Sequence, residues 1–272
     1  MPTLNEGPEQ VDSRKELGEK LAGSFGAEAA RYDRTRPPYP DELVARIVKA
    51  SPGPRVIDVG CGTGTLSRQL KAAGFEVLGV EYDELMAEAA RATGITVDVS
   101  KFETWDPAGR EFDAVVAGQS WHWVDAEQGP RLVARLLRPG GLFVALWHVF
   151  STPDPIAQAL AGAYEEIAPD AKLRLGYSRD EAVDFYRAGC TRTADAFVNT
   201  GEFSNPDQWS VSWDRSYTTA EYLDLLLTMS PLALLTSDQV ASLLDKVAAA
   251  IDTHGGTFTS NYETVAVAVT RN

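Results

Sequence analysis

The sequence has few of the side chains that hold metal ions or form disulfides. Its 272 residues include two cysteines and three histidines. Cys61 and Cys190 have no metal-binding spacing, and a single pair makes no disulfide framework. We therefore expect no metal cofactor. Because disulfides accumulate in proteins of oxidising compartments, we also expect a cytoplasmic location.

Long apolar runs and clusters of basic residues are also missing. No apolar stretch approaches the roughly 18–20 residues that a membrane span needs, and residues 1–20 are polar and mixed in charge, unlike a secretory signal. The formal net charge is −14, which disfavours binding to nucleic acid. We expect a small-molecule substrate, no nucleic-acid or membrane partner, and a monomer or homodimer.

The most informative feature that is present is a glycine-rich turn. The apolar run VIDV, residues 56–59, stops at GCGTG, residues 60–64, and a helix-like segment follows from Thr65. A strand, a glycine turn and a helix in this order present backbone N–H groups to a nucleotide-like ligand. A second strand-like run ends at Glu81, 21 positions after Gly60, where such folds place the acid that accepts ribose hydroxyl protons.

The spacing of the glycines distinguishes between classes of nucleotide. A turn that binds pyrophosphate has the pattern G-x-G-x-x-G, whereas the glycines here stand at 60, 62 and 64. Asp58, on the strand before the turn, brings a negative charge that repels phosphate and suits a ligand with an ammonium group. The stretch resembles motif I of the class I S-adenosylmethionine-dependent methyltransferases, which have the form D-x-G-x-G-x-G.

The resemblance covers residues 24–150 closely and the rest of the chain loosely. Residues 25–40 match the entry motif of the type-11 group, near its trans-aconitate-methyltransferase-like members: an aromatic residue, then Tyr-Asp-x-x-Arg-Pro-x-Tyr-Pro. The resemblance implies S-adenosyl-L-methionine as cofactor, with Tyr32 and Arg36 at its methionine carboxylate, Glu81 at the ribose and Phe102 at the adenine. The expected cofactor-binding residues are Tyr32, Arg36, Asp58, Gly60, Cys61, Gly62, Gly64, Glu81, Tyr82, Met86, Phe102, Glu103 and Gln119.

Strand-like and helix-like segments alternate from residue 55 to residue 150, which predicts parallel strands with helices on both faces. Together with the resemblance, this predicts an α/β fold with a doubly wound, seven-stranded, mostly parallel sheet and an antiparallel closing strand. Residues 1–150 would form N-terminal helices and the cofactor-binding core. Residues 151–235, mostly helical up to 215, would form a substrate cap, and residues 236–272 a C-terminal helix and the closing strand.

The sequence defines the site of the methyl acceptor less closely than the site of the cofactor. His122 follows the fourth strand, and an unperturbed pKa of about 6.5 suits a general base. The aromatic residues and one histidine expected to face the substrate are Trp121, Trp123, Trp147, His148, Trp209, Trp213 and Tyr217. Methyl transfer to oxygen, nitrogen or carbon would proceed by in-line displacement, with alignment and exclusion of water supplied by the protein. Both an aromatic and a carboxylate metabolite fit this description.

Two alternatives remain open at this point. An NAD(P)-dependent oxidoreductase would share the strand–turn–helix arrangement but would have a different glycine spacing. A catalytically silent protein that binds the cofactor and uses the fold for partner recognition would have the same motifs.

Overall fold

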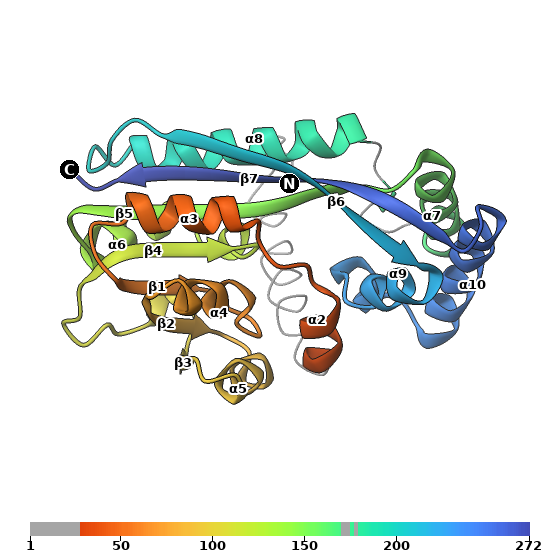
Figure 1. The fold of residues 1–272 in the computed structure, drawn as a ribbon, viewed down its shortest axis with the longest axis horizontal. Helices are drawn as coiled ribbons and strands as arrows, with labels where there is room; N and C mark the ends of the chain where they lie inside the picture. Colours follow the sequence, from red (N-terminus) through yellow and green to blue (C-terminus); the bar gives the residue numbers. More distant parts are fainter. Residues whose placement is uncertain (1–27, 170–174, 177–178) are drawn as a thin grey trace.

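Residues 28–169, 175, 176 and 179–272 are described in the computed structural model of the protein. Within them, seven strands form one sheet in the order β3-β2-β1-β4-β5-β7-β6 (Figure 1). Neighbours among β1 to β5 pair in parallel, and β7 runs antiparallel to β5 and β6. The bounds are β1 Arg55–Val59, β2 Glu76–Glu81, β3 Thr96–Val99, β4 Phe112–Gly118, β5 Leu137–Ser151, β6 Asp207–Thr218 and β7 Thr257–Thr270. The predicted fold class is confirmed.

Helices cover both faces of the sheet because side chains of the central strands alternate between two buried clusters. On β4, Ala114 and Val116 join one cluster, whereas Val115 and Ala117 join the other. Helices α3 Asp41–Ala50 and α4 Thr65–Ala72 pack on the first face, and α6 Gln128–Leu136 and α8 Arg179–Val198 on the second. Short 3₁₀ turns, η2 Phe102–Thr104 and η3 Trp121–Trp123, follow β3 and β4.

Local sequence sets the helix starts near the carboxyl edge of the sheet. Gly64 has φ of 88°, a conformation that favours glycine, and α4 begins at the next residue. Asp83 caps α5 Glu84–Ala92, because its side chain accepts hydrogen bonds from the N–H groups of Leu85 and Met86. Both helices therefore begin close to the ends of β1 and β2.

A second lobe extends beyond the central strands, at the right of Figure 1. It contains α7 Asp154–Ile167, α9 Thr219–Leu226, the 3₁₀ turn η4 Ser230–Leu234 and α10 Ser237–Thr253. Their apolar side chains, together with Tyr217 and Tyr262 from the ends of β6 and β7, form a third buried cluster. The lobe is therefore joined to the sheet by two long strands.

Several sequence-based expectations are wrong. Asp207–Thr218 is a strand, although residues 151–215 were expected to be mostly helical; its apolar residues alternate with polar ones, the period of a strand. Residues 138–141 read Arg-Pro-Gly-Gly, which favours a turn, but they lie within β5. Asp41 is of a residue type that often caps helices, but it is the first residue of α3 and does not cap it.

Two further predictions concern the ends of the chain. Helix α10, expected with the core, has its buried residues in the cluster of the second lobe. Of the helix predicted from Arg14 to Tyr32, only the part from Ala29 onward, in α2 Ala29–Thr35, is described. Phe25 and the rest of that helix lie outside the described residues.

Phe197 is a buried aromatic side chain that anchors helix α8 to the sheet. Phe197 is fully buried, stacks on Phe143 with ring centroids 4.2 Å apart, and lies 5.7 Å from Trp121. Cys190 and Ala194, at helical spacing before it, are buried on the same face.

We predict that Phe197→Ala lowers the free energy of unfolding by about 3–5 kcal/mol, because it leaves a cavity between α8 and the sheet. Val198→Ala is the matched control, since Val198 is exposed on the same helix, and we expect it to change stability by less than about 1 kcal/mol. Urea unfolding followed by circular dichroism measures both. Equal effects of the two substitutions would contradict this packing.

Candidate functional site

The turn after β1 requires its three glycines. Gly60, Gly62 and Gly64 have φ of 64°, 56° and 88°, all in the left-handed region. At Gly60 a side chain would also collide with Ser120, whose Cβ lies 2.5 Å from the place of a Cβ. The backbone of the turn therefore approaches the end of β4 more closely than any other residue would allow.

A cavity opens next to this turn, at the carboxyl edge of the parallel strands. Ligands of open α/β sheets bind at this edge. The lining residues come from several parts of the chain: Tyr32, Arg36, Pro37 and Tyr39 from α2 and the segment after it; Asp58, Cys61, Gly62 and Thr63 from β1 and the turn; Thr65 and Leu66 from α4; Gly118 and Gln119 at the end of β4; His148 and Phe150 from β5; Leu225 from α9; and Tyr262 from β7.

Asp58 provides a buried acceptor in this cavity. Its Oδ2 accepts a hydrogen bond from the hydroxyl of Ser67 at 2.6 Å, whereas Oδ1 is buried without a hydrogen-bond partner. Burial raises the pKa of Asp58 to about 7, against the opposing effect of the Ser67 hydrogen bond, and the nearby Glu81 raises it further. A cationic group beside Oδ1 would satisfy this oxygen and favour the charged carboxylate.

Arg36 provides the complementary donor. Its Nη2 donates to the carbonyl of Thr228 at 2.7 Å, and its guanidinium lies over the ring of Tyr32, 4.6 Å from the centroid. Its Nε is buried without a hydrogen-bond partner. Because buried polar atoms are nearly always paired in native proteins, this unpaired donor and the unpaired acceptor of Asp58 are positions that a ligand with an acceptor group and a donor group can complete.

His148 is held in a fixed orientation on the other side of the cavity. Its Nδ1 lies 2.8 Å from Oγ1 of Thr264, which also accepts a hydrogen bond from the indole N–H of Trp213 at 2.8 Å. Tyr39 stacks on the imidazole with centroids 4.6 Å apart. Burial lowers the pKa of His148 to about 3, against a contribution from the carbonyl of Pro37, so the ring is neutral. Its Nε2 has no hydrogen-bond partner.

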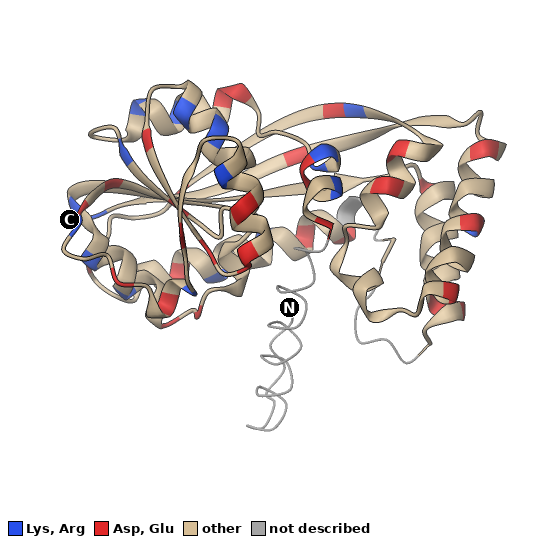
Figure 2. Cartoon of the chain, turned by 90° about the horizontal axis from the view of Figure 1, so that it is seen from below, with Lys and Arg blue, Asp and Glu red and all other residues tan. Residues whose placement is uncertain are grey.

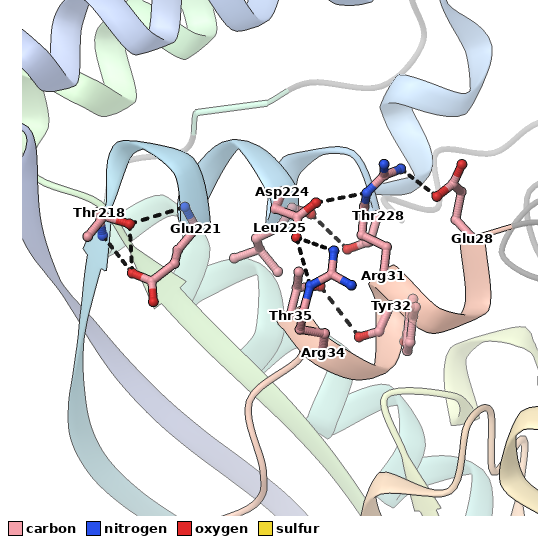
Figure 3. A network of polar contacts seen from close by, with 10 residues as sticks. All are labelled: Glu28, Arg31, Tyr32, Arg34, Thr35, Thr218, Glu221, Asp224, Leu225 and Thr228. Atoms are coloured by element: carbon pink, nitrogen blue, oxygen red, sulfur yellow. Dashed lines mark hydrogen bonds and ion pairs between the residues drawn. The ribbon is translucent and has the colours of Figure 1, made fainter. Parts of the chain in front are cut away.

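The second lobe is fastened to α2 beside the cavity (Figure 3). Asp224 of α9 accepts hydrogen bonds from Nε of Arg31 at 2.8 Å and from Nη2 of Arg34 at 2.6 Å. Arg31 precedes Tyr32, and Asp224 precedes Leu225, and both following residues line the cavity. The ion pairs therefore position two walls of the cavity relative to each other.

Comparisons with known proteins agree with this arrangement. A family profile described as a methyltransferase domain matches residues 56–141. Over 255 residues the chain is 29% identical to an uncharacterized methyltransferase of Mycobacterium bovis, covering 91% of this chain and 95% of that protein. Over 150 residues it is 32% identical to trans-aconitate 2-methyltransferase of Mycobacterium ulcerans, covering 53% of this chain and 56% of that protein.

The fold is shared with solved structures. A protein from Anaeromyxobacter dehalogenans, named as a type II methyltransferase, superimposes with a TM-score of 0.60 at 22% identity, over 86% of this chain and 97% of that one. The matched domain, the relatives and the shared fold together support a class I S-adenosylmethionine-dependent methyltransferase. The same findings support a methyltransferase enzyme, and the similarity implies use of S-adenosylmethionine.

The predicted ribose-binding residue of this methyltransferase lies beside the turn but outside the cavity lining. Glu81 ends β2; its Oε2 accepts from the N–H of Gly62 at 2.7 Å and its Oε1 from the N–H of Asp83 at 2.9 Å. Burial raises the pKa of Glu81, whereas these backbone N–H groups lower it. The carboxylate is thus held in place by the glycine turn itself.

The other residues predicted at the adenosine surround the ends of β2 and β3. Met86 and Phe102 are buried, and Tyr82 is exposed with the ammonium of Lys101 over its ring. Glu103 accepts a hydrogen bond from the N–H of Asp125 at 2.9 Å. None of these four lines the cavity, nor do Gly60 and Gly64 of the turn.

Several residues predicted at the substrate are core residues of the methyltransferase. Trp121 and Trp147 are buried in the cluster under α6 and α8, and Trp209 is buried against α3, where the guanidinium of Arg46 lies over its ring. Their rings pack on protein side chains, and none of the three lines the cavity.

The remaining residues predicted at the substrate differ in their burial and in whether they contact the cavity lining. Trp213 stacks on Tyr262 with centroids 4.3 Å apart, and the hydroxyl of Tyr217 lies 2.6 Å from that of Tyr262. Both residues therefore contact Tyr262, which lines the cavity, without lining it themselves. His122 is exposed, Trp123 is partly buried, and neither lines the cavity.

Sequence reasoning missed part of the lining. Tyr39 stood in the quoted entry motif, which was a usable signal. Phe150, Leu225 and Tyr262 carry no motif and reach the cavity only because the second lobe folds over the sheet edge. Within the described part of the chain, no group of three acidic, histidine or cysteine side chains could hold a metal ion, and no helix is both long and apolar enough to cross a membrane.

We predict that Asp58 makes the stability of the ligand-free methyltransferase fall between about pH 4 and pH 7. Its pKa rises from 3.8 to about 7 on folding, so the unfolded chain releases the proton first as the pH rises, and folding then opposes ionisation. At pH 8, Asp58→Asn should raise the free energy of unfolding by up to about 4 kcal/mol, and the gain should vanish near pH 4.

Urea unfolding across this pH range measures the effect, with Asp195→Asn on the exposed side of α8 as the control. Parallel pH profiles of wild type and Asp58→Asn would contradict the burial of this carboxyl.

Proposed function

We propose that the cavity binds the methionine part of S-adenosylmethionine. The observation that carries the proposal is the pair of buried, unpartnered atoms, Oδ1 of Asp58 and Nε of Arg36. The methionine ammonium would satisfy the first, and the methionine carboxylate the second. A zwitterion also leaves the cavity with balanced charge, since these two side chains carry opposite charges.

The adenosine part would extend along the ends of β2 and β3. Each oxygen of the Glu81 carboxylate accepts one backbone N–H and keeps a further lone pair for a ribose hydroxyl. Phe102 and Met86 would lie at the adenine, with Tyr82 and Glu103 at its margin. The closeness of Gly62 to Glu81 supports one continuous site that spans the glycine turn.

The bound cofactor would supply a methyl group on a positively charged sulfur. The protein would align an acceptor opposite that methyl group and exclude water, which are the main contributions it can make to an in-line displacement. Gln119, at φ of 57°, is held by a hydrogen bond from its side chain to the carbonyl of His148, and would lie at the methyl group. Aromatic rings around the cavity favour a cationic sulfur.

The acceptor would be a small molecule covered by the second lobe. In Figure 2, acidic residues predominate on the helices of that lobe, which disfavours a polyanion such as nucleic acid. A carboxylate or aromatic metabolite fits the cavity, and the partial likeness to trans-aconitate 2-methyltransferase supports a carboxylate. His122 as a general base stays a prediction without support from the cavity, because its side chain is exposed elsewhere. No observation favours an oxidoreductase or a silent cofactor-binding protein.

We predict that Arg36→Gln and Glu81→Gln each weaken the binding of S-adenosylhomocysteine at least tenfold, which corresponds to about 1.4 kcal/mol. The first removes a charged donor from the carboxylate, and the second removes the charge that binds the ribose hydroxyls. Isothermal titration calorimetry measures the affinities. Arg46→Gln and Glu76→Gln are matched controls, since Arg46 is on α3 and Glu76 is exposed at the opposite end of β2.

Wild-type affinity in both test variants would remove the site assignment. Binding of a nicotinamide dinucleotide by a protein that ignores S-adenosylmethionine would remove the proposed function.

A further inference from the structure

We propose that His148 is a fixed hydrogen-bond donor that recognises the methyl acceptor through an oxygen atom on a planar group. This inference rests on the proposed function, since it assigns the part of the cavity that the cofactor leaves free. It concerns the chemical class of the acceptor and the role of one side chain in binding it.

The hydroxyl of Thr264 decides which ring nitrogen of His148 carries the proton. This hydroxyl has one hydrogen and two lone pairs. The indole N–H of Trp213 can only donate, so it occupies a lone pair of Oγ1. Among the described residues, the remaining partner of Oγ1 is Nδ1 of His148, at 2.8 Å. If the hydroxyl accepted from Nδ1–H as well, its own hydrogen would be buried without an acceptor, and the carbonyl of Pro37 near the ring would face an unprotonated Nε2. We therefore infer that the hydroxyl donates to Nδ1 and that the proton of the neutral ring is on Nε2.

That Nε2–H group lies at the cavity lining beside the carbonyl of Pro37, which acts on the ring but makes no hydrogen bond of normal geometry with Nε2. His148 is 5% exposed and lines the cavity, and its Nε2 makes no hydrogen bond within the described part of the protein. Tyr39 on one side of the ring and the edge contacts with Trp213 and Tyr262 prevent it from turning away. A buried, unpartnered and immobilised donor is costly in the free protein and is satisfied when a ligand supplies an acceptor atom.

The position of His148 separates it from the methionine part of the cofactor. Asp58 is on β1 and His148 is on β5, with β4 between them, so about 10 Å of sheet separates the two strands. Arg36 and Asp58 would be occupied by the cofactor zwitterion. The donor left over is thus on the β5 side of the cavity, next to Phe150 and Tyr262, where the acceptor would lie.

The walls next to His148 are flat and aromatic. Phe150 stacks on Tyr262 with centroids 5.2 Å apart and rings inclined by 21°, and Tyr262 stacks on Trp213 at the same inclination. Such a wall packs best on a planar group. A carbonyl or carboxylate oxygen in the plane of that group would accept from Nε2–H, whereas an ammonium group would meet a donor and be rejected.

The same geometry gives His148 a role in binding and excludes it as a base. Nε2 already holds a proton, and Nδ1 is occupied by the Thr264 hydroxyl. The charged groups that act on the ring, Arg36 and Arg215, are both positive and oppose its protonation, and Tyr39 and Tyr262 face it as neutral phenols. The donor should therefore be present throughout the range from pH 5 to pH 8.

The tautomer can be measured in the protein without any ligand. The chain has three histidines, so long-range ¹H–¹⁵N correlation spectra are simple, and the signals missing in His148→Gln identify His148. We expect a protonated Nε2, an unprotonated Nδ1, and no titration between pH 5 and pH 8. Thr264→Val should release the ring to a mixture of tautomers. A proton on Nδ1 in the wild type, or conversion to imidazolium in this range, would overturn the assignment.

Recognition is tested with benzoate and benzylamine, two probes of similar size, added to protein saturated with S-adenosylhomocysteine. We expect benzoate to shift the Nε2 signal and benzylamine to leave it unchanged. In His148→Phe, the affinity for benzoate should fall at least tenfold, whereas His148→Gln, which keeps a donor amide, should retain most of it. S-adenosylhomocysteine should bind both variants within about twofold of the wild type.

Equal binding of the two probes, or no binding of benzoate, would overturn the proposed class of acceptor. Loss of S-adenosylhomocysteine binding in His148→Phe would instead place His148 in the cofactor site and also overturn the proposal. Failure of the proposed function has a separate signature, which is a wild-type protein that binds no S-adenosylhomocysteine while the tautomer of His148 is as predicted.

Discussion

Burial of the Asp58 carboxyl at the end of β1 is the constraint around which the site is organised. A carboxyl taken out of water is tolerated when hydrogen bonds or a countercharge replace the water. The hydroxyl of Ser67 replaces the water at Oδ2 by a hydrogen bond, whereas Oδ1 is buried without a hydrogen-bond partner. The adjacent turn of left-handed glycines keeps this space open, because side chains at these positions would be strained. The free protein thus holds a buried acceptor that the proposed ligand ammonium would complete.

Completion of the cavity depends on contacts between distant parts of the chain. The second lobe contributes Leu225 and Tyr262, and it is positioned by ion pairs from Asp224 to α2. These pairs are partly exposed, so each contributes little to overall stability. Their effect is on the position of the cavity lining, because α2 also contains Tyr32 and is followed directly by Arg36, and both of these residues line the cavity. Movement of the lobe would therefore change the methionine end and the acceptor end of the cavity together.

Local patterns in the sequence were sufficient for the core but not for the lobe. The run VIDVGCGTG and the acid at Glu81 predicted the strand, turn and helix, because these structures are set by neighbours in sequence. The strand Asp207–Thr218 was missed although its alternation was visible, since it lies among segments with helical periodicity. The aromatic residues after β4 and on β5 were predicted as one group, but the structure separates them: Trp121 and Trp147 pack in the core, whereas His148 lines the cavity. Which residue of an alternating strand faces a cavity depends on register and on the lobe above it, and neither is encoded locally.

The most direct measurement of the central claim is a crystal structure of the protein with S-adenosylhomocysteine. The account predicts that the ligand ammonium lies within hydrogen-bonding distance of Oδ1 of Asp58, and that its carboxylate accepts from Nε of Arg36. A ligand bound elsewhere, or bound here with both of these atoms still unpartnered, would contradict it.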